Sequence, residues 1–146
     1  MTTVKSILLV EDNEDDAFLM KRALKDAEVK NPLCVAQDGQ EAIDYLSGSG
    51  AFSDRQTYPM PAVVFLDLKL PMISGHQVLE WIRKQSSFKD LVVIVLTSSN
   101  QPADLTKSYQ LGANSYLVKP PTTAQLSDLA KAFKRYWLEF NRFEIT

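Results

Sequence analysis

The sequence contains a single cysteine, Cys34, and therefore cannot form an intramolecular disulfide. Cys34 lies in the apolar run 32–36, so we expect a small hydrophobic side chain that packs in the interior. No stretch approaches the roughly 18 consecutive apolar residues that indicate a membrane-spanning helix. The first residues also lack the apolar segment of a signal peptide. These absences favour a cytoplasmic protein with no membrane partner.

An excess of charge of one sign is also missing, because 16 lysines and arginines face 18 aspartates and glutamates, for a formal net charge of −2. Nucleic-acid-binding domains usually carry a basic footprint, and acidic tails appear as blocks of like charge. The sequence has neither feature, so we expect no nucleic-acid partner. Its 146 residues, 45% of them hydrophobic, contain no repeat or linker and predict one domain over residues 1–146.

The most informative stretch is an apolar run that ends in a single carboxylate. Residues 62–66 are all apolar, Asp67 follows them, and a turn with Pro71 and Gly75 comes next. A short apolar run bounded by turn residues is typical of a strand buried on both faces of a parallel sheet. Ligands bind at the carboxyl ends of such strands, so Asp67 is the first candidate functional residue.

Apolar runs and helical periodicity alternate along the chain. Besides 62–66, strands are expected at 6–10, 33–36, 91–96 and 115–118. Helices are expected at 13–29, 40–46, 75–84, 102–111 and from 122 to about 143. A stretch of fourteen residues, 48–61, predicts an unusually long loop. The alternation predicts an α/β fold with a five-stranded parallel sheet and helices on both faces.

Four of the expected strands end in polar residues that could act together, and these are Glu11 with Asp12, Asp67, Thr97 and Lys119. They should meet, because the carboxyl ends of parallel strands share one edge of the sheet. Carboxylates, water and phosphate are ligands that Mg²⁺ prefers, and a carboxylate nucleophile can form an aspartyl-phosphate. The metal, Lys119 and Thr97 would then supply counter-charge and donors to the phosphoryl oxygens.

Each of these residues also has a purely structural interpretation. Either Asp12 or Asn13 could cap the helix after the first strand, and Thr97 could cap a later one. Asp67 could occupy a turn, and Lys119 could be a solvated surface lysine. Together these interpretations require four separate strands to end in such residues by chance. The only histidine in the sequence, His76, is interpreted as a surface or capping residue and not as a phosphoryl donor.

The combination resembles the receiver domain of two-component response regulators. That family has an acidic pair after the first strand, Asp-x-x-x-Pro-x-x-x-Gly after the third, Ser or Thr after the fourth and Lys-Pro after the fifth. The resemblance spans residue 6 to about residue 133 and implies the flavodoxin-like, doubly wound (βα)5 sheet in strand order 2-1-3-4-5, of which receiver proteins are a standard example. The matching positions are Glu11-Asp12, Asp67…Pro71…Gly75, Thr97 and Lys119-Pro120.

The resemblance implies a function for these residues. Asp67 would accept a phosphoryl group from a sensor histidine kinase, and Thr97 and Lys119 would bond the phosphoryl oxygens. The protein would be a signalling switch and not an enzyme. Mg²⁺ would be the cofactor, held by Asp12, Asp67, the backbone carbonyl of Lys69 and, through water, Glu11.

The resemblance implies two conformational features as well. Tyr116 matches the aromatic residue that changes rotamer as Thr97 moves, although half-buried packing is the structural alternative. The peptide bond between Lys119 and Pro120 is expected to be cis, whereas the base rate for such a bond is only about 5%. Ser99, two residues after Thr97, is expected to influence how long the phosphoryl group lasts, and so is Lys69.

Three details resemble the single-domain regulators that pair with bacterial phytochromes: the long loop 48–61, the Glu11-Asp12 pair and the Pro120-Pro121 sequence. This resemblance implies a red-light-sensing histidine kinase as partner. No output domain is expected after the receiver domain.

The last helix carries an aromatic stripe that continues beyond the expected length of the sheet. Phe133, and with it Tyr136, is expected to pack on the protein's own sheet, while the distal aromatics would need another surface. We therefore expect a symmetric homodimer. The candidate interface consists of Phe133, Tyr136, Trp137, Phe140 and Phe143.

Other functions are considered alongside the phosphoryl-accepting switch. A phosphorelay intermediate and a receiver-like module that is never phosphorylated remain open. An aspartate phosphatase would need a second acid two residues after its nucleophile, where this chain has Lys69. Dinucleotide binding is disfavoured, because no Gly-x-Gly-x-x-Gly turn follows the first strand and two acids there would repel a phosphate.

Overall fold

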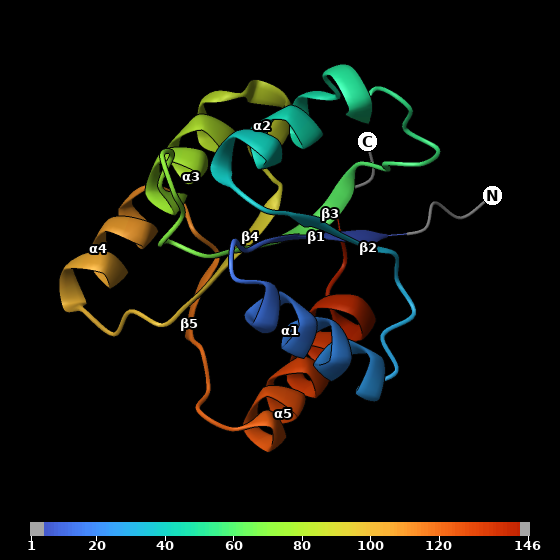
Figure 1. Ribbon diagram of the computed structural model, residues 1–146, viewed down its shortest axis with the longest axis vertical. Helices are drawn as coiled ribbons and strands as arrows, with labels where there is room; N and C mark the ends of the chain where they lie inside the picture. The colour runs from blue at the N-terminus through green and yellow to red at the C-terminus, as the bar shows by residue number, and fades with distance from the viewer. Residues whose placement is uncertain (1–4, 144–146) are drawn as a thin grey trace.

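A computed structural model describes residues 5–143, and its centre is a five-stranded parallel sheet (Figure 1). The strands pair in the order β2-β1-β3-β4-β5, and all four pairings are parallel. Both the α/β class and the strand order predicted from the sequence are therefore confirmed. The strands are β1 (Ser6–Val10), β2 (Leu33–Ala36), β3 (Pro61–Leu66), β4 (Val92–Thr97) and β5 (Ser115–Val118).

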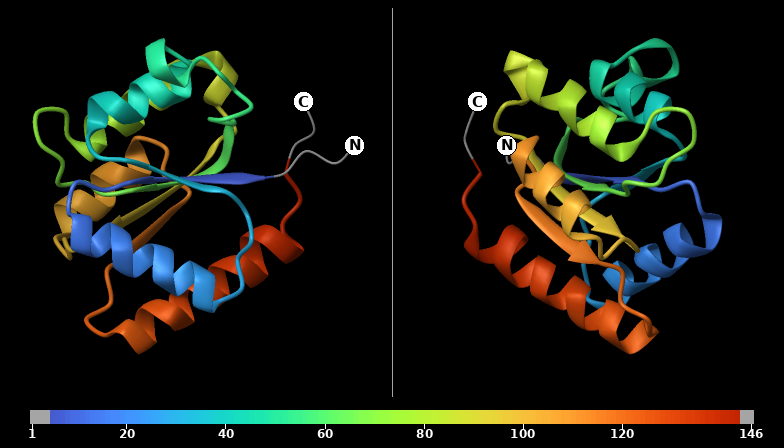
Figure 2. Two further views of the ribbon diagram at one scale, coloured as in Figure 1. Left: turned by 45° about the vertical axis from the view of Figure 1, so that its right-hand side comes forward. Right: turned by 90° about the vertical axis from the view of Figure 1, so that its left-hand side faces the viewer.

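Helices cover both faces of the sheet (Figure 2). One face carries α1 and α5, which pack against each other, and the opposite face carries α2 and α3. Helix α4 contacts α3 and lies beside the edge strand β5. Within the described residues, no helix is long and apolar enough to span a membrane. The helices are α1 (Glu14–Asp26), α2 (Gly39–Ser47), α3 (Gly75–Lys84), α4 (Pro102–Gln110) and α5 (Thr123–Phe133).

Local sequence signals account for where these helices begin. The Asn13 side chain accepts a hydrogen bond from the Asp16 N–H and caps α1. Ser74 and Gln77 form a reciprocal capping box at the start of α3. The strands β1, β3 and β4 are buried almost throughout, because helices cover both of their faces. The result is a rigid sheet whose carboxyl edge presents the candidate site.

The last helix differs from the expectation of one helix reaching about residue 143. The α-helix ends at Phe133, and residues Lys134–Phe140 continue as wider π-helical turns. Phe133 is buried, and Trp137 and Leu138, four and five residues later, pack partly on the same core. The i→i+5 spacing of π-helical turns keeps these side chains on one side of the helix. The π-helical turns therefore coincide with the segment whose Trp137 and Leu138 side chains pack on the core.

The long loop predicted at 48–61 is present, and it packs against α2. It contains a short 3-10 turn, Gly50–Phe52. The Phe52 ring packs at a tilt against Tyr45 and edge-to-face against Tyr58, at centroid distances of 5.2 and 5.0 Å. The Arg55 guanidinium donates to the carbonyls of Tyr45, Tyr58 and Leu46 at 2.8, 3.2 and 2.9 Å. Arg55 thereby satisfies carbonyls at the carboxyl end of α2.

Replacing Arg55 with methionine should lower the free energy of unfolding by about 2 kcal/mol, because hydrogen bonds from a charged donor are lost and partly buried carbonyls lose their partner. Urea unfolding followed by circular dichroism measures the change. Arg22→Met is the matched control. Arg22 is exposed, and its ion pair with Asp26 is long at 4.0 Å and therefore weak. Equal stability of the two variants would contradict the role given to Arg55.

Candidate functional site

The predicted site residues converge at the carboxyl edge of the sheet. Glu11 and Asp67 follow the neighbouring strands β1 and β3, and the Asp67 N–H donates to the carbonyl of Val10 at 3.1 Å. Thr97 ends β4 and Lys119 follows β5, and the Lys119 N–H donates to the Thr97 carbonyl at 2.7 Å. Strand pairing alone therefore brings together residues that are more than 100 positions apart.

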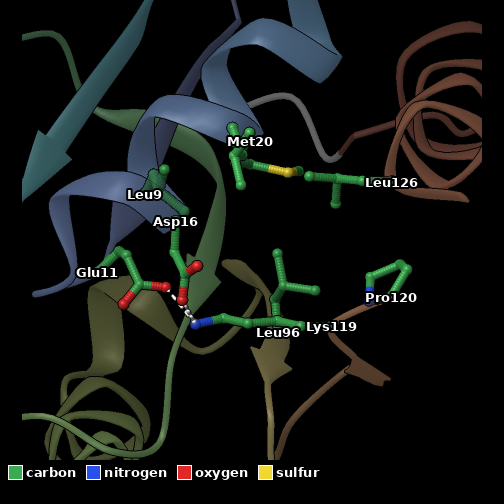
Figure 3. A pocket seen from close by; sticks show the side chains of 9 residues that line it. Leu9, Glu11, Asp16, Met20, Leu96, Lys119, Pro120 and Leu126 are labelled. Atoms are coloured by element: carbon green, nitrogen blue, oxygen red, sulfur yellow. Dashed lines mark hydrogen bonds and ion pairs between the residues drawn. The ribbon is translucent and has the colours of Figure 1, made fainter. Parts of the chain in front are cut away.

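The Lys119 ammonium is the centre of the cluster. Its Nζ lies 2.5 Å from Oε1 of Glu11, 2.9 Å from Oδ2 of Asp67 and 2.9 Å from Oδ2 of Asp16. An ammonium has three N–H donors, so all three are directed to carboxylates. Figure 3 shows the Lys119 side chain extending from β5 toward Glu11 and Asp16. The predicted proximity of Lys119 to the acids is therefore observed.

The Asp67 carboxylate is buried, with 5% of the residue exposed. Its Oδ1 accepts a hydrogen bond from the Lys69 N–H at 3.2 Å, while Oδ2 faces Lys119. These two contacts fix the orientation of the carboxylate. Gly75 at the start of α3 donates its N–H to the Leu68 carbonyl at 2.9 Å and closes the turn beneath the site.

Three acids could hold a cation together. Glu11, Asp12 and Asp67 each offer a carboxylate oxygen, and these oxygens lie within 4.8 Å of one another. Glu11 and Asp67 are buried, and Asp12 is exposed at the opening. A set of carboxylate oxygens open to water on one side suits a hard divalent cation such as Mg²⁺ or Mn²⁺. The donor set therefore fits divalent metal binding.

The electrostatics of the cluster affect Glu11 most. Burial raises the pKa of Glu11 to about 7, the hydrogen bond from Lys119 opposes this rise, and the negative charge of Asp67 adds to it. Burial lowers the pKa of Lys119, but hydrogen bonds to Glu11, Asp16 and Asp67 more than reverse this and hold it above its ordinary value. Lys119 therefore stays charged, while Glu11 can take up a proton near neutral pH.

This pKa predicts how the stability of the metal-free protein depends on pH. The Glu11 pKa is about 7 in the folded state against 4.5 for the ordinary side chain, so between those values the folded state binds more protons than the unfolded state. Stability should therefore fall as the pH rises from 5 to 7.5, by about 2 kcal/mol for this group. Urea unfolding in EDTA measures it, and Glu11→Gln should flatten the curve. A slope that is unchanged in Glu11→Gln would refute the assignment.

The remaining predicted switch residues form a connected group next to Thr97. Thr97 is fully buried, and its Oγ1 accepts weakly from the Ser99 N–H at 3.4 Å. The Tyr116 hydroxyl donates to the Ser99 carbonyl at 2.9 Å, and Ser99 Oγ donates to Asp104 Oδ2 at 2.5 Å. Tyr116 is thus tied to the segment that follows Thr97, while its change of rotamer stays a prediction.

The expectation of a cis bond between Lys119 and Pro120 is wrong. No peptide bond among residues 5–143 is cis. The trans form of a bond to proline is favoured by about 0.5–1 kcal/mol, and Lys119 reaches all three acids with this bond trans.

The sequence analysis missed Asp16 as a site residue and misjudged His76. Asp16 lies in the first turn of α1, three residues after the N-cap Asn13, and no local feature of the sequence separates it from the neighbouring acids Glu14 and Asp15. His76 is half-buried, and its Nε2 lies 3.0 Å from Oγ of Ser108, which joins α3 to α4. His76 is therefore neither a free surface residue nor a helix cap.

The aromatic stripe of the C-terminal segment is divided between core and surface. Phe133 is buried against Phe65, with ring centroids 4.7 Å apart, and Trp137 and Phe143 pack partly on the same core. Trp137 and Phe143 are therefore covered in part by the protein's own core and do not require a partner surface. The expectation that Tyr136 packs on the sheet with Phe133 is wrong, because Tyr136 is 61% exposed, and Phe140 is 65% exposed.

The chain as a whole is similar in sequence to known proteins. The response regulator receiver domain family matches residues 7–131. The probable methanogenesis regulatory protein FilR2 from Methanothrix harundinacea is 37% identical over 139 residues, covering 93% of this chain and 85% of that protein. Response regulator Rcp1 from Synechocystis sp. is 34% identical over 135 residues, covering 92% and 90%.

Solved structures agree with this assignment. The phosphorylated cyanobacterial phytochrome response regulator RcpA superposes with a TM-score of 0.90 at 32% identity, over 98% of this chain and 100% of that one. The Mn²⁺-bound form of Rcp1 gives a TM-score of 0.86 at 33% identity, over 97% and 99%. Because the family match spans most of the chain and these relatives align over nearly their full length, the chain belongs to the response regulator receiver family.

Proposed function

We propose that this protein is a two-component signalling switch that accepts a phosphoryl group on Asp67 in a Mg²⁺-dependent reaction. The observation that carries the proposal is the contact between the Lys119 ammonium and Asp67 Oδ2 at 2.9 Å, beside two further acids that can share a cation with Asp67. A lone surface lysine would not be surrounded by buried carboxylates in this way. The arrangement supports phosphoryl transfer, which depends on positioning and counter-charge.

In the proposed reaction, a carboxylate oxygen of Asp67 attacks the phosphorus of a phosphohistidine on a sensor kinase. An O–P bond forms, the P–N bond breaks, and the histidine ring leaves with the electron pair. Asp12 and Asp67 would bind Mg²⁺ directly, with the Lys69 carbonyl as a further ligand and Glu11 through water. When bound, the ion neutralises phosphoryl charge. Lys119 and Thr97 would donate to the transferred oxygens.

The phosphoacceptor is tested with acetyl phosphate and MgCl₂. The intact mass of the wild-type protein should rise by one phosphoryl group, and Asp67→Asn should abolish the rise, because an amide cannot replace the carboxylate nucleophile. Asp44→Asn, a change at a half-buried acid on α2, is the control and should leave the mass gain intact. No gain in the wild-type protein would favour a receiver-like module that acts without phosphorylation.

We further propose that the donor is a phytochrome-type histidine kinase acting in the cytoplasm. The support is the similarity to RcpA, described as a phytochrome response regulator, over 98% of this chain. Purified phytochrome kinase labelled with radioactive phosphate should transfer the label to wild-type protein within minutes, and the amount should differ between red and far-red light. Equal transfer from an unrelated sensor kinase would contradict this partner.

The exposed aromatics support a homodimer as part of the same proposal. Tyr136 and Phe140 are large apolar side chains on the surface, and the Arg135 guanidinium lies 5.1 Å from the Phe140 ring centroid. Replacing Tyr136 and Phe140 together with serine should shift sedimentation from dimer to monomer at tens of micromolar protein. A monomeric wild-type protein, with and without acetyl phosphate, would refute the dimer.

A further inference from the structure

Asp16 differs from the other acids at the start of α1. The first turn carries Glu14, Asp15 and Asp16, and such residues commonly serve only to complement the helix dipole. Glu14 and Asp15 are exposed, whereas Asp16 is half-buried with its Oδ2 2.9 Å from Lys119 Nζ. Asp16 is therefore aimed at the site from a helix, while the other acids of the site follow strands.

Asp16 also lies outside the group of acids that could share a cation. That group contains Glu11, Asp12 and Asp67, and two of its members also bond to Lys119. A cation held by these acids would repel the nearby Lys119 ammonium. Asp16 offers the ammonium a carboxylate that the cation does not need. The three bonds of Lys119 therefore divide into two that compete with a cation and one that does not.

The surroundings strengthen the pair formed by Asp16 and Lys119. The two side chains line a cavity of about 60 Å³ between α1 and α5, as Figure 3 shows, and the other walls are largely apolar. Only 18% of the Lys119 side chain is exposed, against 41% for Asp16. An apolar wall lowers the local dielectric and strengthens an ion pair, while the exposure of Asp16 limits the gain. The apolar lining includes Leu9, Leu19, Met20, Leu96 and Leu126.

We propose that Asp16 is a positioning residue that gives the Lys119 ammonium a carboxylate partner of its own, so that Glu11 and Asp67 can turn to a divalent cation while the ammonium stays in place. The same contact holds the ammonium beside Asp67, where phosphoryl oxygens would meet it. The statement about phosphoryl oxygens rests on the proposed function. The division of Lys119 between cation ligands and Asp16 concerns the unphosphorylated protein alone.

The test compares Asp16→Asn with Asp15→Asn in the full chain. Both changes remove one negative charge from the first turn of α1, but only Asp16 contacts Lys119. Mg²⁺ affinity, measured from amide shifts in NMR titrations, should fall about tenfold in Asp16→Asn, the lower end of the usual effect of a residue that supports a metal site. It should fall less than about twofold in Asp15→Asn. Asp16→Glu should recover most of the affinity.

A second readout follows Lys119 itself in the absence of metal. The side-chain resonances of Lys119 should shift in Asp16→Asn, remain in place in Asp15→Asn and return toward their original positions in Asp16→Glu. Equal Mg²⁺ affinities for the two Asn variants, unchanged Lys119 resonances, or no Mg²⁺ binding by the wild-type protein would overturn the inference. Acetyl phosphate treatment of the same samples tests the proposed function separately, because neither readout requires phosphorylation.

Discussion

Replacing Gly75 with alanine is expected to destabilise the protein by about 3 kcal/mol, the upper end of the usual cost of overpacking, and to displace Asp67. A Cβ at this position would lie 2.2 Å from the Asp67 carbonyl oxygen and 2.6 Å from the Leu68 Cα. Both are backbone atoms, so no side chain can move aside, and the turn beneath the site must shift. Urea unfolding measures the loss of stability, and the acetyl phosphate assay measures the effect on Asp67.

Gly50→Ala is the matched control for this prediction. Gly50 has a positive φ of 56°, but an added Cβ would meet nothing within 4 Å. The free energy of unfolding should fall by about 1 kcal/mol, because alanine is strained in the left-handed backbone conformation at this position. A Gly75→Ala protein that is as stable as Gly50→Ala would show that the close approach of α3 to Asp67 is not required.

Replacing Lys119 with methionine is expected to slow phosphoryl uptake from acetyl phosphate by about 100-fold, the usual cost of losing a donor to developing charge. Mg²⁺ affinity should rise, because the ammonium no longer competes for Glu11 and Asp67. Without metal at pH 8, the free energy of unfolding should fall by about 2 kcal/mol, because the buried carboxylates lose the Lys119 ammonium as their partner. That loss should shrink at pH 5, where Glu11 is protonated.

Lys131→Met controls for the change in net charge, since Lys131 is exposed on α5. The uptake rate and the Mg²⁺ affinity should stay within about a factor of two of the wild-type values. The free energy of unfolding should change by less than about 0.5 kcal/mol. A Lys119→Met protein that takes up phosphoryl at the wild-type rate would remove Lys119 from the proposed mechanism.

The sheet and most of the candidate site were predictable from residue patterns along the chain. Runs of apolar residues in β1, β3 and β4 leave no polar face, so these strands must be covered on both sides, which requires a parallel sheet with helices. The positions of Glu11, Asp67, Thr97 and Lys119 then follow, because parallel strands place their carboxyl ends along one edge. No side-chain detail was needed for this conclusion.

The tertiary structure alone decided which contacts these residues make. The pairing of Asp16 with Lys119 depends on how α1 packs beside the end of β5, and neither residue carries a local signal of the other. The π-helical turns after Phe133 likewise had no signal in the sequence analysis, which expected one regular α-helix to about residue 143. Local sequence specifies the elements and their ends, whereas contacts between distant elements depend on side-chain packing in three dimensions.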